Sequence, residues 1–134
     1  RLGILGMGRI GQKIAKVAKS LGMIIHYHNR SKLGADKEDG AIYHDNLKDL
    51  LSVSDVLSVC CPASKETINM INKETLEHLP KGAVVTNVAR GDIIEDEALI
   101  LCFIPYLELV INPPILFKDR LLAESVVSFL KFTL

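Results

Sequence analysis

Residues 2–20 read LGILGMGRIGQKIAKVAKS, and this stretch decides the fold. It begins with an apolar run, residues 2–5, which is typical of a strand buried in a sheet. After position 10 apolar residues recur at helical spacing, as they do in a helix that packs on a core. Glycines at positions 6, 8 and 11 stand between the two patterns. The stretch therefore predicts a strand, a tight turn and a helix.

The three glycines fit the pattern G-x-G-x-x-G, which binds dinucleotides when it joins a strand to a helix. Gly6 allows the sharp turn, Gly8 leaves the backbone open to a pyrophosphate, and Gly11 lets the helix pack closely on the strand. Free N–H groups and the positive end of the helix dipole then face the phosphates. A plain tight turn without a ligand is the alternative. We expect a dinucleotide to be bound by Gly6, Gly8, Arg9, Ile10 and Gly11.

The rest of residues 1–100 alternates apolar runs with helical patterns. The runs at 23–27, 55–61 and 83–88 predict buried strands, and residues 41–43 predict a short one. Asn46 is suited to cap a helix over 47–51, the segments 65–72 and 73–79 predict short helical pieces, and a further helix begins near Glu95. Residues 31–40 are polar and predict a surface loop. This alternation predicts an α/β fold, a doubly wound parallel sheet of the Rossmann type over residues 1–100.

The residues after the second strand bear on the choice of cofactor. An acidic residue about 20 positions after the glycines hydrogen-bonds the adenosine ribose in sites that prefer NAD. Here the sequence is Asn29, Arg30, Ser31, with no carboxylate to repel a 2′-phosphate, and Arg30 offers a planar fork of donors. We therefore predict NADP(H) as the cofactor, with NAD possible, bound by Asn29, Arg30 and Ser31. The alternative is that Arg30 and Lys32 are merely solvated loop charges.

Composition narrows the class of partner. Sixteen basic residues balance sixteen acidic ones, which argues against a nucleic-acid or anionic-membrane binder and favours a small molecule. The apolar stretch after residue 100 is interrupted by Pro105, Glu108 and a double proline before it could span a membrane. The three cysteines lack metal-ligand spacing, so we expect no metal site, reduced thiols and a cytoplasmic location.

Three stretches, in order, resemble the nucleotide-binding domain of the D-isomer-specific 2-hydroxyacid dehydrogenases, in particular the glyoxylate and hydroxypyruvate reductase branch. They are LGILGMGRIGQKIAKVAKSLGM with YHNRS after it, DVLSVCCPASKETINMI, and VVTNVARGDIIEDEAL. The resemblance implies an oxidoreductase that reduces a small 2-keto acid to a D-2-hydroxy acid by hydride transfer. It also implies that this domain forms homodimers, and that the cofactor is contacted by Cys61, Pro62, Thr67, Val88 and Ala89.

The resemblance assigns one catalytic residue within this stretch, Arg90. This arginine would hold the carboxylate of the keto acid and polarise its carbonyl, a task suited to a fixed cation with bidentate geometry. A structural ion pair of Arg90 with Asp92 or Glu95 is the alternative. None of the four histidines lies where this family keeps its catalytic histidine, and we interpret His26, His28, His44 and His78 as ordinary residues.

Residues 101–134 depart from the family pattern. The family takes its proton from a histidine tuned by a glutamate, yet Pro113 stands where the glutamate is expected and no histidine follows His78. The chain also begins at Arg1 rather than Met, so we expect a fragment with an altered or atypical C-terminal segment. The isolated chain should be inactive. A non-catalytic module that senses dinucleotides is the alternative function, and a chain that does not fold stably is a third possibility.

Overall fold

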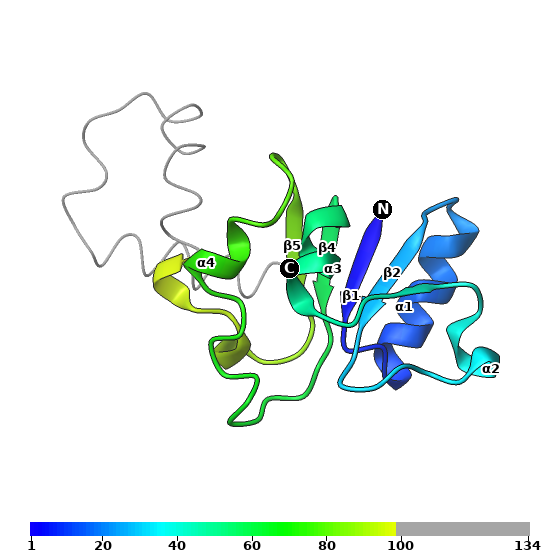
Figure 1. Cartoon of the computed structure of the whole chain (residues 1–134), viewed down its shortest axis with the longest axis horizontal. Helices are drawn as coiled ribbons and strands as arrows, with labels where there is room; N and C mark the ends of the chain where they lie inside the picture. The colour runs from blue at the N-terminus through cyan, green and yellow to red at the C-terminus, as the bar shows by residue number, and fades with distance from the viewer. Residues whose placement is uncertain (99–134) are drawn as a thin grey trace.

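The computed structural model describes residues 1–98, which form a five-stranded parallel sheet with helices on both faces (Figure 1). The strands are β1 (Leu2–Leu5), β2 (Ile25–His28), β3 (Ile42–Tyr43), β4 (Val56–Val59) and β5 (Val84–Asn87). The helices are α1 (Arg9–Ser20), α2 (Ala35–Glu38), α3 (Leu47–Val53) and α4 (Lys73–Leu76), and a 3-10 turn, η1, covers Gly91–Ile93. The predicted α/β sheet is confirmed. The predicted boundary at residue 100 and the C-terminal segment 101–134 lie outside the described residues.

The order of the strands, β3-β2-β1-β4-β5, places β1 at the centre of the sheet. The chain moves from β1 outward to β2 and β3, and α3 then leads it back across the sheet to β4 and β5. Leu2 of β1 is paired with Ile25 on one side and with Val56 on the other. The direction of winding therefore reverses between β1 and β4. In open parallel sheets, ligands bind at the carboxyl ends of the strands at such a switch point.

Each face of the sheet is covered by a hydrophobic core, because successive side chains of a strand point to opposite faces. On the α1 face the buried residues are Leu2, Ile4, Met7, Ala15, Ala18, Ile25 and Tyr27. On the α3 face they are Leu5, Leu50, Leu51, Leu57, Val59, Cys61, Ile71, Leu76, Ile93, Ile94 and Ala98. A Cβ at Gly3 would overlap the hydroxyl of Ser54, so β1 and the end of α3 are in close contact.

The helix capped by Asn46 is confirmed. The Asn46 side chain accepts a hydrogen bond from the Asp49 N–H at 2.9 Å, which satisfies one of the free donors at the start of α3. The helix ends at Val53, two residues beyond the predicted end at 51. Residues 96–98 are helical, in agreement with the helix predicted to begin near Glu95.

Strands β3, β4 and β5 and the helical piece predicted over 73–79 are present but shorter than predicted. Three segments differ more from the sequence-based expectation. Strand β2 begins at Ile25 rather than at 23, because the Met23 N–H still donates to the Ala18 carbonyl at the end of α1. The polar segment 31–40 contains the short helix α2. Residues 65–69 form turns rather than a helical piece, and the Thr67 side chain closes this turn on the Ser64 N–H.

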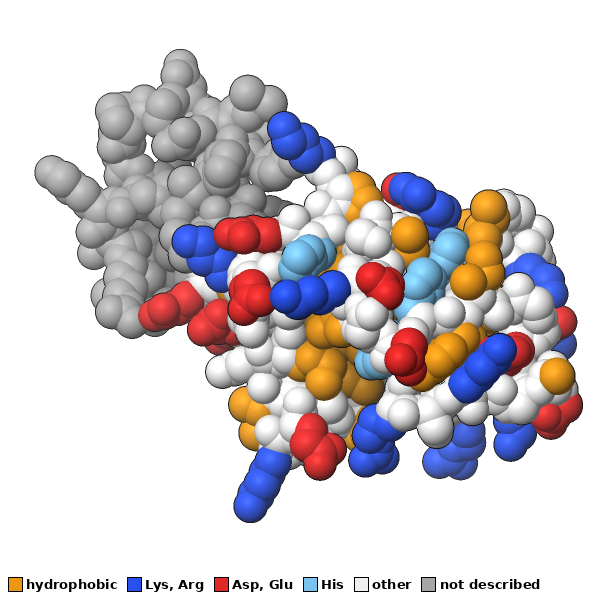
Figure 2. Space-filling model, viewed as in Figure 1, with side chains coloured by type: hydrophobic (Ala, Val, Ile, Leu, Met, Phe, Trp, Pro, Cys, Tyr) orange, Lys and Arg blue, Asp and Glu red, His pale blue; other side chains and the backbone are white. Residues whose placement is uncertain are grey.

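The surface carries charges of both signs. Figure 2 shows Lys and Arg side chains interspersed with Asp and Glu side chains over the face in view. Between residues 1 and 98, no helix has both the length and the apolar character needed to cross a membrane.

Candidate dinucleotide site

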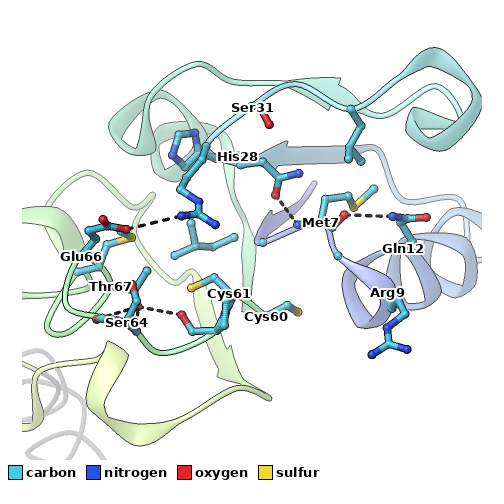
Figure 3. A pocket seen from close by; sticks show the side chains of 18 of the residues that line it. Met7, Arg9, Gln12, His28, Ser31, Cys60, Cys61, Ser64, Glu66 and Thr67 are labelled. Carbon is cyan, nitrogen blue, oxygen red and sulfur yellow. Dashed lines mark hydrogen bonds and ion pairs between the residues drawn. The ribbon is translucent and has the colours of Figure 1, made fainter.

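A cleft of about 520 Å³ lies where β1, β2 and β4 end, at the switch point of the sheet (Figure 3). The segments that follow β1, β2 and β4 in the chain line this cleft. Its lining consists of Leu5, Gly6, Met7, Gly8, Arg9, Gln12, His28, Asn29, Arg30, Ser31, Leu33, Lys37, Cys60, Cys61, Pro62, Ser64, Glu66, Thr67 and Met70. Nine of the predicted cofactor-binding residues are among them: Gly6, Gly8, Arg9, Asn29, Arg30, Ser31, Cys61, Pro62 and Thr67.

Two of the three motif glycines are required by the packing of the folded chain. Gly6 has a φ of +96°, and a Cβ there would lie 2.5 Å from the backbone nitrogen of Cys61. At Gly11 a Cβ would lie 2.6 Å from the carbonyl oxygen of Gly6, so only glycine lets α1 start this close to β1. Gly6 thus lets the loop after β1 approach the loop after β4, and Gly11 lets α1 pack on the loop after β1.

Gly8 differs from both, because no contact within residues 1–98 requires glycine there. Its backbone is extended, with a φ of −81°, and a Cβ would meet no atom of these residues within 4 Å. The position faces the open cleft. A bare Cα with empty space in front of it is what the approach of a pyrophosphate to the backbone needs.

The first turn of α1 offers free hydrogen-bond donors beside Gly8. No side chain caps the helix, and no acceptor within residues 1–98 takes the amide N–H of Arg9, Ile10 or Gly11. The first turn also carries no acidic residue. These donors and the positive end of the helix dipole form a site for an anion.

Asn29 ties the end of β2 to the glycine loop. Its side-chain oxygen accepts a hydrogen bond from the Met7 N–H at 2.7 Å (Figure 3). The Gln12 side chain donates to the Met7 carbonyl at 3.2 Å, so Met7 is fixed from both sides. Asn29 therefore orients the loop that would hold the phosphates, and its side-chain oxygen is already engaged within the protein.

The loop that carries Arg30 and Ser31 is anchored on a buried tyrosine. The hydroxyl of Tyr27 accepts from the Leu33 N–H at 3.0 Å and donates to a Glu38 carboxylate oxygen at 2.5 Å. Burial and the contact with Glu38 raise the pKa of Tyr27 to about 12, so the hydroxyl stays protonated at neutral pH. Arg30 and Ser31 are exposed at the rim of the cleft, held between this anchor and Asn29.

The loop after β4 forms the opposite wall. The hydroxyl of Thr67 donates to the Pro62 carbonyl at 2.8 Å and accepts from the Ser64 N–H at 2.7 Å, which closes a compact turn. Burial raises the pKa of the thiols of Cys60 and Cys61. Both thiols therefore remain protonated at neutral pH and are poor nucleophiles, in keeping with a packing role.

Five predicted site residues lie outside the lining of the cleft: Ile10, Gly11, Val88, Ala89 and Arg90. Ile10 is on the outer side of α1, and Gly11 packs α1 on β1. The other three follow β5, the edge strand beyond β4. Arg90 is exposed and forms no ion pair with any described residue, so the ion pairs with Asp92 or Glu95 considered above are not present.

Sequence reasoning missed several residues of the cleft. Gln12 could have been found, since it follows Gly11 on the first turn of the helix. His28, which the sequence pattern indicates to be an ordinary residue, lines the cleft, and its Nδ1 lies 2.9 Å from the His44 carbonyl oxygen. Lys37 is on α2 and Glu66 is in the turn after β4, and no local pattern connects either of them with the glycines. Within residues 1–98 no group of His, Cys, Asp or Glu side chains could hold a metal ion.

The switch-point cleft, the bare loop at Gly8 and the uncapped start of α1 together define a Rossmann-type dinucleotide-binding domain. Comparison with known families agrees with this class. The model of the D-isomer specific 2-hydroxyacid dehydrogenase NAD binding domain matches residues 1–103, and the chain belongs to this family.

The sequence is similar to relatives that are named glyoxylate reductase and glycerate dehydrogenase. It is 46% identical over 100 residues to a glyoxylate reductase of Aeropyrum pernix, a match that covers 74% of this chain and 30% of the relative. It is 42% identical over 101 residues to a glycerate dehydrogenase of Hyphomicrobium methylovorum, with 74% and 31% covered. The crystal structure of a glyoxylate reductase from Paecilomyes thermophila superposes with a TM-score of 0.73 at 42% identity, covering 76% of this chain and 31% of that one. The chain thus spans about a third of the length of the relatives it matches.

Proposed function

We propose that residues 1–100 are the cofactor domain of an NADP(H)-dependent reductase of a small 2-keto acid, of the glyoxylate or hydroxypyruvate type. The observation that carries the proposal is Gly8, which faces the cleft although no contact among the described residues requires glycine there. Beside it are the N–H groups of the first turn of α1, which have no acceptor within residues 1–98. A pyrophosphate explains both features. When bound, the nicotinamide cofactor supplies the hydride that reduces the keto group.

The preference for NADP(H) over NAD(H) is supported by the charges around the cleft. Arg30 and Ser31 stand at its rim after β2, and Arg9 and Lys37 also line it. No carboxylate follows β2 at the position where NAD-preferring sites carry one. The side chain of Arg30 is 90% exposed, so it can turn toward a 2′-phosphate without breaking a buried contact.

Replacing Arg30 with alanine should erase this preference. Hydrogen bonds to charged groups contribute about 1.5–3 kcal/mol, so NADP(H) should bind roughly ten- to a hundredfold more weakly to the variant while NAD(H) changes little. Titration calorimetry with both cofactors measures the effect, and Lys32→Ala is the matched control because Lys32 carries the same charge and does not line the cleft. Equal affinities for the two cofactors before and after the change at Arg30 would refute the preference.

Arg90 is the residue we propose to orient the keto acid. It follows β5 at the same carboxyl edge of the sheet as the cleft, and it is exposed. A fixed cation with two parallel donors suits a carboxylate and polarises the adjacent carbonyl. The names of the relatives, which include glyoxylate reductases and a glycerate dehydrogenase, support this class of substrate.

The isolated chain of 134 residues should show no turnover of glyoxylate above the uncatalysed rate. Protonation of the nascent alkoxide needs an acid near Arg90. Among the described histidines, three belong to the β2–β3 side of the sheet, and His78 is exposed after α4. Loss of NADPH absorbance with glyoxylate, followed beside a glyoxylate reductase as the positive control, measures this. Rapid oxidation of NADPH by the purified chain would contradict the expectation.

The proposal also includes a cytoplasmic location and a homodimer. The cytoplasmic location is favoured by Cys60 and Cys61, which are free thiols. Pairing of two copies through this domain is favoured by apolar side chains exposed on the outer side of α1, among them Ile10, Val17 and Leu21.

A further inference from the structure

We propose that Glu66 is a specificity-determining residue of the cofactor site: it pairs with the Arg30 guanidinium across the cleft and so weakens the binding of 2′-phosphorylated nucleotides. The inference rests on the proposed function, since it assumes that the cleft binds the adenosine half of a dinucleotide. It concerns a residue that follows β4, far in sequence from the Arg30 loop.

The observation is an ion pair across the cleft. Arg30 Nη1 lies 3.8 Å from a Glu66 carboxylate oxygen, and both residues line the cleft (Figure 3). Glu66 is the only carboxylate among the described residues of that lining, which otherwise carries the cations Arg9, Arg30 and Lys37. Glu66, the one negative side chain in this lining, therefore pairs with Arg30, the cation that we propose to bind the 2′-phosphate.

The two loops keep the pair in reach of each other. The turn that carries Glu66 is closed by the hydroxyl of Thr67, which bonds both Pro62 and Ser64. The residue before Arg30 is Asn29, whose side chain is bonded to the Met7 N–H. Side-chain hydrogen bonds thus anchor the backbone next to both residues of the pair.

Charge decides the direction of the effect. A 2′-phosphate that approaches Arg30 must displace Glu66 and then stays near a like charge, whereas an unmodified ribose meets neither cost. The pair is widely exposed, with side-chain exposures of 90% for Arg30 and 74% for Glu66, so solvent screens the interaction. We expect Glu66→Gln to tighten the binding of a 2′-phosphorylated nucleotide about three- to tenfold, in line with a screened unit charge at short range.

The test uses two adenosine nucleotides that differ only in the 2′-phosphate, 2′,5′-ADP and 5′-AMP. Their dissociation constants are measured by NMR titration of the full chain as wild type, Glu66→Gln, Arg30→Ala and the double variant. Glu74→Gln is the matched control: Glu74 is also 74% exposed and also pairs with an exposed cation, Lys48, at 3.1 Å, but it does not line the cleft. Both substitutions are on the surface and remove the same charge.

The expected result is tighter binding of 2′,5′-ADP by Glu66→Gln, with 5′-AMP changed less than about twofold and the Glu74 variant unchanged. The gain should vanish when Arg30 is alanine, because Glu66 acts through the guanidinium. An equal change for both nucleotides, no change, or a gain that persists without Arg30 would overturn the inference while leaving the binding domain intact. If the wild-type chain binds neither nucleotide, the proposed function falls as well.

Discussion

Gly8→Ala is expected to leave the stability of the chain unchanged and to weaken the binding of NADP(H) roughly ten- to a hundredfold, the loss of at least one charge-assisted hydrogen bond. The backbone of Gly8 is extended, and a Cβ there would meet no atom of the described chain within 4 Å. The methyl group instead occupies space that a pyrophosphate needs. Thermal unfolding and titration calorimetry on the same preparation measure the two halves of this prediction.

Gly34→Ala is the matched control for Gly8→Ala. Gly34 is also extended, with a φ of −66°, but it precedes α2 and does not line the cleft. A Cβ there would meet only the carboxylate of Asp36, an exposed side chain that can move aside. Binding by the Gly34 variant should equal that of the wild type. A Gly8 variant that binds as well as the Gly34 variant would show that the bare position has no role in binding.

Gly6→Ala should have the opposite signature, a large loss of stability. Alanine at a φ of +96° is strained, and its Cβ would lie 2.5 Å from the Cys61 nitrogen and 2.6 Å from the Cys61 Cα. Backbone atoms cannot move aside as a flexible side chain can. The backbone strain costs about 1–3 kcal/mol, and overpacking against Cys61 costs about as much. Together they should lower the free energy of unfolding by about 3 kcal/mol or more. Urea unfolding followed by circular dichroism measures it.

Gly22→Ala separates the two causes of that loss. Gly22 has a φ of +83° at the end of α1, and a Cβ there would meet no described residue within 4 Å. The Gly22 variant therefore suffers backbone strain alone, about 1 kcal/mol. If Gly6→Ala costs no more than Gly22→Ala in the free energy of unfolding, the loops after β1 and β4 are farther apart than the 2.5 Å between a Gly6 Cβ and the Cys61 nitrogen implies.

The sheet could be predicted from the sequence because its signals are local. Leu2 to Leu5 form a buried apolar run that ends at a glycine, and Asn46 stands immediately before a helical pattern. The start of β2 could not be placed so well. Met23 and Ile24 continue its apolar run, but pairing with β1 begins only where Ile25 meets Leu2. Met23 is apolar, yet its N–H still donates to the Ala18 carbonyl at the end of α1. Hydrophobicity alone does not show where such hydrogen bonds of a helix C-terminus end and strand pairing begins.

The cleft was predictable only in part. The residues that follow β1 and β2 are marked by the glycine motif and by its distance from the next strand, so Gly8 and Arg30 were expected to contribute. Glu66 and Lys37 were not, since neither has a partner within a few positions and each reaches the cleft only after the sheet has formed. The closed turn at 64–67 likewise depends on a side-chain hydrogen bond of Thr67 that no periodic pattern indicates.

The most direct test of the central claim is titration of the purified chain with NADPH, with Gly8→Ala alongside it. We predict saturable binding at one site by the wild type, a melting temperature that rises with cofactor concentration, and weaker binding by the variant. A wild-type melting temperature that stays unchanged with both NADPH and NADH, or equal binding by the two proteins, would contradict the assignment of this loop to a dinucleotide.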